Sequence, residues 1–199
     1  MQENFYEAMK NRRSVYAISD ETTIPDERLT EIIGQAVQNV PSAFNNQSAR
    51  VAVLFGDNHK KLWSITMETL RKLVPPEIFA PTESKINAFA AGYGTILYFD
   101  DTFITNSFAE KFSAYKDNFP VWAQQANGML QFAVWTSLEA EGLGATLQHY
   151  NPLIDDEVKA NWKLPPNWKL IAEMPFGKPV AAPDAKQFTP LEERMLLFK

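Results

Sequence analysis

The spacing of apolar and polar positions predicts a well-defined helix at residues 23–40. Apolar side chains recur there every three or four residues, which places them on one face of a helix. Pro25 and the two acidic residues that follow suit a first turn, because proline lacks an N–H and acids complement the positive helix end. The residues expected on the buried face are Leu29, Ile32, Ile33, Ala36, Val37 and Val40.

Similar patterns predict the remaining elements. We expect helices at residues 3–11, 57–74, 84–91 and 155–162, and two more between 102 and 141 with a break near Pro120. Runs rich in β-branched and aromatic residues predict strands at 50–56, 94–101 and 168–177. This order indicates an α+β fold in which helices dominate about four short strands, and the length suits a single domain over residues 1–199.

Two apolar segments favour a partner subunit. The helix expected between Pro120 and Gly142 is apolar on most sides, which is typical of a helix buried in a core or between subunits. Residues 178–199 contain three prolines and little periodicity, so they predict an extended tail. The tail ends in the apolar run 195–198, which needs something to pack on. These features favour a homodimer.

Composition and charge narrow the function classes. The net charge is −5 and no basic stripe is present, which disfavours a nucleic-acid partner. No apolar run of about 18 residues predicts a membrane span, and no signal peptide is recognisable, so a cytoplasmic location is the default. The chain has no cysteine and two histidines, which excludes thiol chemistry and disfavours a bound metal such as zinc. Redox chemistry would therefore need a bound cofactor.

The sequence NRRS at residues 11–14 is a candidate anion site. Arg12 and Arg13 offer planar forks of donors, and Ser14 adds a hydroxyl, a combination that suits a phosphate or a carboxylate. A solvated basic helix end is the competing interpretation, because the helix dipole favours cations there. Lys178 and Lys186 lie in the tail, where solvated side chains are the alternative to an anion contact; a fixed, extended tail favours the contact for Lys186.

A polar loop, PSAFNNQSAR at residues 41–50, joins the helix at 23–40 to the first expected strand. Neutral amides and hydroxyls suit the edge of a heterocycle, which presents donors and acceptors together. An ordinary polar loop is the alternative. The side chains concerned are Ser42, Asn45, Asn46, Gln47 and Ser48.

The stretch EGLGATLQHYNP at residues 141–152 follows the long apolar helix. A dinucleotide-binding loop requires a third glycine and a preceding strand, and both are missing. We therefore interpret Gly142 or Gly144 as a helix cap that also leaves bare backbone against which a flat ligand can lie. His149 is either a general base or a structural histidine, and the structural role is favoured; His59 is expected in solvent at a polar helix start.

In combination, the motifs RRSVY, PSAFNNQSARV, EGLGATLQHYNP and FGKP resemble those of the nitroreductase family of FMN-dependent oxidoreductases. The resemblance covers essentially the whole chain and is greatest to the short bacterial and fungal branch typified by the yeast fatty-acid-repression-mutant-type proteins. It implies a nitroreductase-like fold with a central, mostly antiparallel sheet flanked by helices. It also implies an intertwined homodimer with an extended C-terminal tail and FMN at the subunit interface.

The resemblance also assigns cofactor-binding positions. The arginine–arginine–serine motif would hold the FMN phosphate and the ribityl chain or ring edge, and the 41–47 loop would approach in part from the partner subunit. The glycine–leucine–glycine turn would pack against the isoalloxazine with a backbone N–H near N5, and the tail lysine would contact the phosphate. The positions are Arg12, Arg13, Ser14, Pro41, Ser42, Asn45, Gln47, Gly142, Leu143, Gly144 and Lys186.

The activity that the resemblance implies is an FMN-dependent NAD(P)H oxidoreductase. NADH or NADPH would reduce flavin N5 by hydride transfer, and a nitroaromatic or quinone-type acceptor would then replace the nucleotide in a ping-pong reaction. The flavin carries this chemistry, so no protein side chain is expected to be catalytic. One departure is Phe188, where longer family members often have a second basic residue. Either the phosphate contact rests mainly on Arg12 with Lys186, or Lys178 substitutes for the missing residue. The alternatives are a flavin-binding regulatory or stress-response protein with little turnover and, with less support, a helical interaction module without a ligand.

Overall fold

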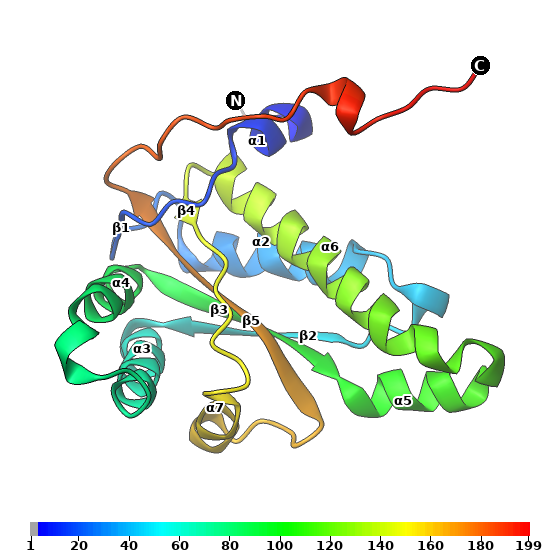
Figure 1. Ribbon diagram of the computed structural model, residues 1–199, viewed down its shortest axis with the longest axis horizontal. Helices are drawn as coiled ribbons and strands as arrows, with labels where there is room; N and C mark the ends of the chain where they lie inside the picture. Colours follow the sequence, from blue (N-terminus) through cyan, green and yellow to red (C-terminus); the bar gives the residue numbers. More distant parts are fainter. Residues whose placement is uncertain (1–3) are drawn as a thin grey trace.

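A five-stranded sheet with helices on both faces forms the centre of the computed structural model, which describes residues 4–199 (Figure 1). The strand order is β1-β5-β3-β2, and β4 pairs with β5 outside this path. All of these ladders are antiparallel, as the expected fold class requires. The strands are β1 (Ile18–Ser19), β2 (Ala49–Phe55), β3 (Gly94–Asp101), β4 (Gly144–Ala145) and β5 (Trp168–Pro179).

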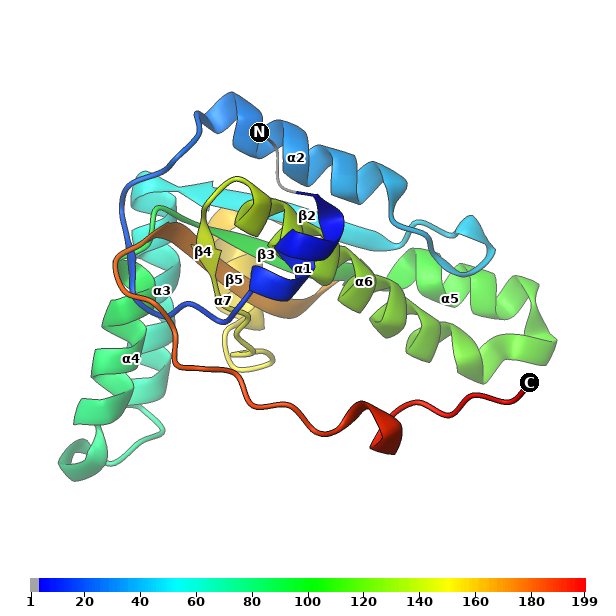
Figure 2. The ribbon, with the colours of Figure 1, turned by 90° about the horizontal axis from the view of Figure 1, so that it is seen from above.

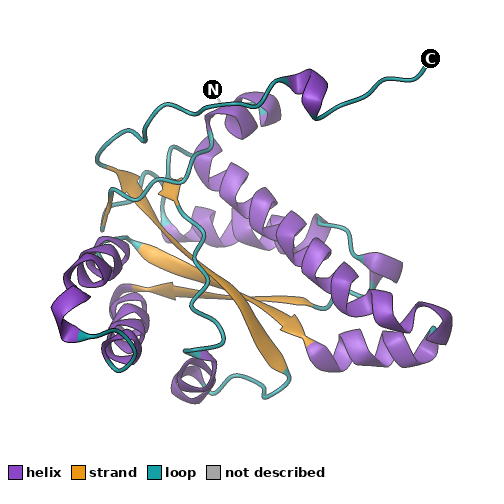
Figure 3. Cartoon of the chain, viewed as in Figure 1, coloured by secondary structure: helices purple, strands orange, loops and turns teal. Residues whose placement is uncertain are grey.

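The central strand β3 is buried on both faces and separates two cores. Ile96 and Tyr98 belong to the core beneath α2 (Asp26–Asn39) and α6 (Phe119–Ala140). Leu97 and Phe99 belong to the opposite core, which is closed by the other helix layer (Figure 3). A strand that is covered on both sides reads as a continuous apolar run, and the sequence of this strand has that form. The opposite layer contains α3 (Gly56–Arg71), α4 (Ala80–Ala90) and α7 (Asp155–Trp162).

Most predicted elements are present, with differences at turns and short strands. The two-residue strands β1 and β4 were not predicted, because two residues carry no periodic signal. The helix predicted at 57–74 ends at Arg71, and Leu73, expected on its buried side, is exposed. The break predicted near Pro120 is confirmed at 112–118, and Pro120 itself lies in the first turn of α6, where its missing N–H costs nothing.

Two short helices complete the fold, α1 (Phe5–Asn11) and α5 (Thr102–Lys111). The start of the first helix was predicted at residue 3, which lies outside the described residues. No helix within residues 4–199 has the length and apolar composition that a membrane span requires.

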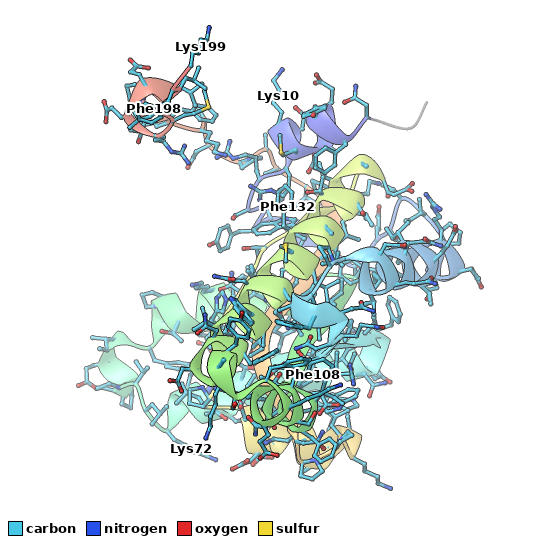
Figure 4. All side chains as sticks on the ribbon, turned by 90° about the vertical axis from the view of Figure 1, so that its right-hand side faces the viewer. Lys10, Lys72, Phe108, Phe132, Phe198 and Lys199 are labelled. Atoms are coloured by element: carbon cyan, nitrogen blue, oxygen red, sulfur yellow. The ribbon has the colours of Figure 1, made fainter. Side chains whose placement is uncertain are left out.

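Apolar surface remains uncovered on α6 and on the tail. Met129 and Phe132 lie on the outer side of α6, and Phe132 is visible at the helix surface beside α1 (Figure 4). The tail is extended, as predicted, and every residue from Lys178 onward is exposed. Phe198 is 90% exposed and lies apart from the folded body in Figure 4. Within the described part of the chain, nothing buries the end of the tail.

The two histidines occupy the opposite environments from those expected. His149 is exposed, whereas His59, expected in solvent, is buried on the inner face of α3. The His59 Nε2 atom lies 3.2 Å from the carbonyl oxygen of Ala90, which can only accept, so Nε2 carries the proton. The Nδ1 atom lies 2.8 Å from the Thr95 hydroxyl, and that hydroxyl accepts the indole N–H of Trp63 at 3.0 Å. Burial lowers the pKa of His59 because the charged ring is poorly solvated there.

The buried histidine predicts a specific pH dependence of stability. In the folded protein His59 stays neutral below its ordinary pKa of 6.5, while the unfolded chain takes up the proton. Its contribution to the free energy of unfolding is therefore present above pH 6.5 and is lost as the pH falls from 6.5 toward the lowered folded value. Urea denaturation of His59→Gln should show a shallower loss of stability than the wild type over this interval. His149→Gln is the matched control, and a His59→Gln profile parallel to the wild type would contradict the prediction.

Candidate functional site

The chain after α1 runs alongside β4 and brings two of the predicted motifs together. The backbone N–H of Arg12 donates to the carbonyl of Ala8 at 2.8 Å, which closes α1. Ser14 then forms a parallel bridge with Ala145, and the N–H of Val15 donates to the Ala145 carbonyl at 3.0 Å. The arginine–arginine–serine motif is thereby fixed beside the glycine turn that follows α6.

The Arg12 guanidinium lies against an aromatic ring and leaves one buried N–H without an acceptor. Its central carbon lies 4.3 Å from the ring centroid of Trp135, and its Nε atom is buried with no hydrogen-bond partner. Burial lowers the pKa of Arg12; the charge of Glu139 opposes this shift and that of Arg13 adds to it. No ion pair of residues 4–199 includes either arginine. A buried, unpaired guanidinium N–H is an open position for an anion.

A groove of about 400 Å³ lies next to this pair. Residues 13–17 form one wall, and residues 181–184 of the tail form the other. Lys186 lies two residues beyond this wall, exposed, with its ammonium 5.1 Å from the ring centroid of Phe188. Lys178, the other tail lysine, instead pairs with Glu21 at 2.7 Å. The structure therefore brings Arg13, Ser14 and the start of the tail to one groove, with Arg12 adjacent to it in the chain.

The glycines after α6 have two separate structural functions. Gly142 has φ +78°, its N–H donates to the Glu139 carbonyl, and the N–H of Leu143 donates to Leu138 at 2.9 Å. This pair of bonds is a Schellman cap, which confirms the cap interpretation. The Leu143 side chain lies in the core. A Cβ at Gly144 would lie 2.9 Å from Val15, so this glycine allows the two chain segments to approach.

The loop after α2 has a strained backbone. Phe44, Asn45 and Gln47 have positive φ values of 54°, 52° and 51°. Residues other than glycine rarely adopt such backbone angles. The Ser42 hydroxyl holds the turn by accepting the N–H of Gln47 at 2.9 Å. Such strain persists only where the surroundings enforce it, and it is concentrated at functional sites.

The side chains of this loop divide between solvent and interior. Pro41, Asn45 and Gln47 are exposed and Ser42 is half-buried, whereas Asn46 points inward and is buried. The buried polar residue Ser48 adjoins it. The four positions named by the resemblance are thus the ones that can reach a ligand from outside, while the buried pair supports the loop.

Phe44 joins a cluster of aromatic residues at the start of α6. Its ring centroid lies 4.5 Å from that of Phe112 and 6.0 Å from that of Trp122, yet 49% of its surface is exposed. Tyr115 is also within the cluster and half-exposed. The cluster offers flat apolar faces next to the exposed amides of the loop.

The two groups of candidate residues lie toward opposite ends of α6 within one chain (Figure 2). Arg12 contacts Trp135, and Phe44 contacts Trp122. Thirteen residues separate these tryptophans, which at the rise of an α-helix is roughly 20 Å. The structure therefore does not bring the loop at 41–47 together with the arginines.

Glu173 braces the stretch that follows the glycine turn. It lies fully buried in β5, where its backbone exchanges hydrogen bonds with Gln148 at 2.7 and 2.9 Å. Its Oε2 atom accepts the N–H of Tyr150 at 2.9 Å, and Oε1 has no partner. Burial raises the pKa of Glu173 to about 8, and the nearby charge of Asp155 adds to the shift. This shift favours the protonated form of the carboxyl at neutral pH.

Known proteins share the sequence pattern and the fold of this chain. The profile of the nitroreductase family matches residues 9–178, which is most of the chain. The chain belongs to the nitroreductase family. This confirms the resemblance seen in the motifs. Two yeast relatives also support the branch that the motifs suggested.

Two yeast proteins are similar to this nitroreductase over nearly their whole length. The Saccharomyces cerevisiae protein named putative nitroreductase HBN1 is 32% identical over 188 residues, 92% of each chain. Nitroreductase FRM2 from the same organism is 30% identical over 190 residues, 93% of each chain.

Solved structures share the fold. Nitroreductase CinD from Lactococcus lactis in complex with chloramphenicol has a TM-score of 0.90 and 39% identity, over 98% of this chain and 100% of that one. CinD has also been solved with 4-nitrophenol, with a TM-score of 0.89. A putative nitroreductase in complex with FMN from Desulfovibrio desulfuricans has a TM-score of 0.68 at 20% identity, over 100% of this chain and 99% of that one, and shows the common fold.

Sequence reasoning missed three parts of the candidate site: Trp135, Glu173 and the tail wall at 181–184. A tryptophan within an apolar helix and a glutamate within an apolar strand look like ordinary members of their elements. The only local signal was spacing, because Trp135 and Glu139 are one helical turn apart and so share a face.

The buried carboxyl predicts a pH effect on stability opposite in sign to that of His59. The folded pKa of Glu173, about 8, lies above the ordinary value of 4.5, so unfolding releases a proton between these values. Its contribution to stability is complete below pH 4.5 and is lost as the pH rises through 8. Glu173→Gln should retain the bond to Tyr150 and lose less stability between pH 5 and pH 8 than the wild type.

Urea denaturation across this range measures the effect. Glu157→Gln, on the exposed side of α7, controls for the loss of one negative charge. Parallel profiles for Glu173→Gln and the wild type would show that the carboxyl is ionised in the folded protein.

Proposed function

We propose that this chain is an FMN-dependent NAD(P)H oxidoreductase that reduces nitroaromatic or quinone-type acceptors. The observation that carries the proposal is the buried Nε of Arg12, which has no hydrogen-bond partner and adjoins Arg13, a residue that lines the groove of about 400 Å³. A phosphate monoester fits this position, because it supplies the missing acceptor and adds negative charge beside two adjacent arginines. Membership of the nitroreductase family supports a flavin phosphate as that anion.

The residues around the groove have distinct tasks in holding FMN. Arg12 and Arg13 supply charge to the phosphate, and Ser14 supplies a hydroxyl toward the phosphate or the ribityl chain. Lys186 completes the phosphate contact from the tail, in place of the basic residue absent at Phe188. Lys178 is less suited to this task because Glu21 already neutralises it.

The glycine turn provides the surface for the flat ring. Gly142 and Gly144 carry no side chain, and Leu143 fixes the turn to the core. The N–H groups of Gly142 and Leu143 already donate to carbonyls of α6, so a donor toward flavin N5 must come from elsewhere in the stretch. Glu173 keeps the following residues in place through Gln148 and Tyr150.

A second copy of the chain completes the site in this proposal. The loop residues Pro41, Ser42, Asn45 and Gln47 lie roughly 20 Å along α6 from the arginines, so a partner in a homodimer would present them to the flavin. The exposed apolar residues of α6 and of the tail support this arrangement, because a dimer interface would cover them.

The bound cofactor supplies hydride transfer at N5, first from NADH or NADPH and then to the acceptor. The chain positions the acceptor and excludes water. Phe44 and its aromatic neighbours offer faces on which an electron-poor ring stacks. CinD, with its complexes of chloramphenicol and 4-nitrophenol, supports small aromatic acceptors.

A flavin-binding regulatory or stress-response protein with little turnover is the second candidate. The observation that favours it is the crowding of aromatic residues between 103 and 122, which could close over the ring in the dimer. The two candidates differ in whether the flavin can be reached by a nucleotide and an acceptor.

Flavin content and reduction separate these functions. The purified protein should be yellow, with absorbance near roughly 450 nm, and NADH or NADPH should bleach it under anaerobic conditions. Added 4-nitrophenol or a quinone should then restore the colour. Flavin that neither nucleotide reduces would support the regulatory alternative. Colourless protein that takes up no added FMN would exclude both candidates.

Mixed dimers test the shared site. Arg12→Ala and the double variant Asn45→Ala/Gln47→Ala should each lose FMN as homodimers. When they are co-expressed with different affinity tags, the heterodimer has one site with both halves intact and should retain about half of the wild-type flavin. A heterodimer of two differently tagged Arg12→Ala chains is the control. Flavin absent from the mixed dimer, or a wild-type monomer that retains FMN, would contradict the arrangement.

A further inference from the structure

Trp135 connects three segments at the proposed phosphate site. It lies near the C-terminal end of α6, and its ring faces the Arg12 guanidinium at 4.3 Å. Its indole N–H donates to the carbonyl of Ala145 at 3.2 Å. The same oxygen accepts the N–H of Val15 at 3.0 Å. One side chain therefore fixes both the arginine and the backbone bridge that carries Ser14.

The contact between Trp135 and Arg12 leaves a hydrogen-bond donor of the guanidinium unused. A cation over an aromatic face is attracted by the ring, and tryptophan is the strongest such partner. A contact of this kind needs no hydrogen bond, and the buried Nε–H of Arg12 has no acceptor beside Trp135. Trp135 can therefore hold Arg12 in position without occupying the donors that an anion needs.

The charges around Arg12 favour an added anion. Arg13 is adjacent and repels it, and burial disfavours its charged form. Glu139, one turn beyond Trp135 on α6, partly compensates. The buried Nε without an acceptor shows that this compensation leaves hydrogen-bonding capacity unused. The cost of ordering the arginine is already met in the folded chain, which is the condition for a preorganised site.

We propose that Trp135 is a positioning residue for phosphate recognition, holding Arg12 with its ring and the Ser14–Ala145 bridge with its indole N–H. This inference rests on the FMN site proposed above. Trp135 acts on the phosphate through Arg12 and Ser14, so its effect should depend on the presence of the phosphate on the ligand. Riboflavin, which has the same ring and ribityl chain without the phosphate, is the matched ligand.

Binding of FMN and of riboflavin to flavin-depleted protein tests the inference by quenching of flavin fluorescence. Trp135→Leu should weaken FMN binding by about tenfold, the upper part of the range for a cation–π contact, and should change riboflavin binding by less than about twofold. Trp135→Phe keeps an aromatic face and loses the indole N–H, so it should restore part of the FMN affinity.

Trp162→Leu is the matched control for the loss of an indole. Trp162 lies on α7 at the other side of the sheet, its N–H donates to Asn58 at 3.0 Å, and the Lys61 ammonium lies 6.0 Å from its ring centroid (Figure 1). Like Trp135, Trp162 has an indole N–H that donates a hydrogen bond and a cation near its ring, but it lies away from the groove. Both flavin affinities should stay at wild-type values in this variant.

A double-mutant cycle identifies the route. In the Arg12→Ala background, Trp135→Leu should weaken FMN binding by much less than tenfold, because the residue it positions is gone. Equal losses for FMN and riboflavin, an unchanged FMN affinity, or full additivity with Arg12→Ala would each overturn the role of Trp135. Wild-type protein that binds riboflavin as tightly as FMN would instead overturn the phosphate site, and that result needs no variant.

Discussion

The packing of α6 along one face of the sheet is the constraint on which the rest of the structure depends. Leu130, Val134 and Leu138 bury one side of this helix against the sheet, where α6 contacts β2 and β3. A helix is stiff and its length is fixed by its residue count, so the groups attached at its two ends stay apart. Arg12 and β4 are held toward one end, and Phe44 and the amide loop toward the other. The same helix that completes the core thus divides the candidate site into two halves and turns its remaining apolar side outward.

Both halves contain features that an ordinary core or loop would avoid. At the first, the Nε of Arg12 is buried without a partner. At the second, Phe44, Asn45 and Gln47 adopt left-handed backbone conformations. Unpaired buried donors and backbone strain each reduce stability, and a fold retains them where the surroundings enforce them. These features lie in the two predicted motifs. The arginines of the first suit an anion, and the amides and aromatic rings of the second suit a flat heterocycle. Elsewhere in the fold, the buried groups Glu173 and His59 have opposite effects on the pH dependence of stability.

Membership of the nitroreductase family gives this arrangement a chemical context. The chain itself offers binding surfaces more than reactive side chains. It has no cysteine, its only exposed histidine within residues 4–199 is His149, and the buried carboxyl of Glu173 supports backbone. A protein of this kind contributes by orienting a cofactor and by choosing what stacks on it. The tail matters for the same reason, because its first residues form a wall of the groove while its last residues lie uncovered.

The sequence by itself determined the long periodic elements, such as the helix at 23–40 and the strand at 94–101, because their side chains repeat a pattern that burial imposes. It also determined the candidate motifs, since arginine pairs, amide-rich loops and glycine turns carry their chemistry locally. Only the tertiary structure decided which of these meet. The bridge between Ser14 and Ala145 joins segments about 130 residues apart. Neither the two-residue strand β4 nor the contact of Trp135 with Arg12 produces a periodic pattern in the sequence. His59 shows the limit most directly: its polar neighbours in the sequence indicated solvent, and the packing of α3 against β3 and α4 placed it in the core.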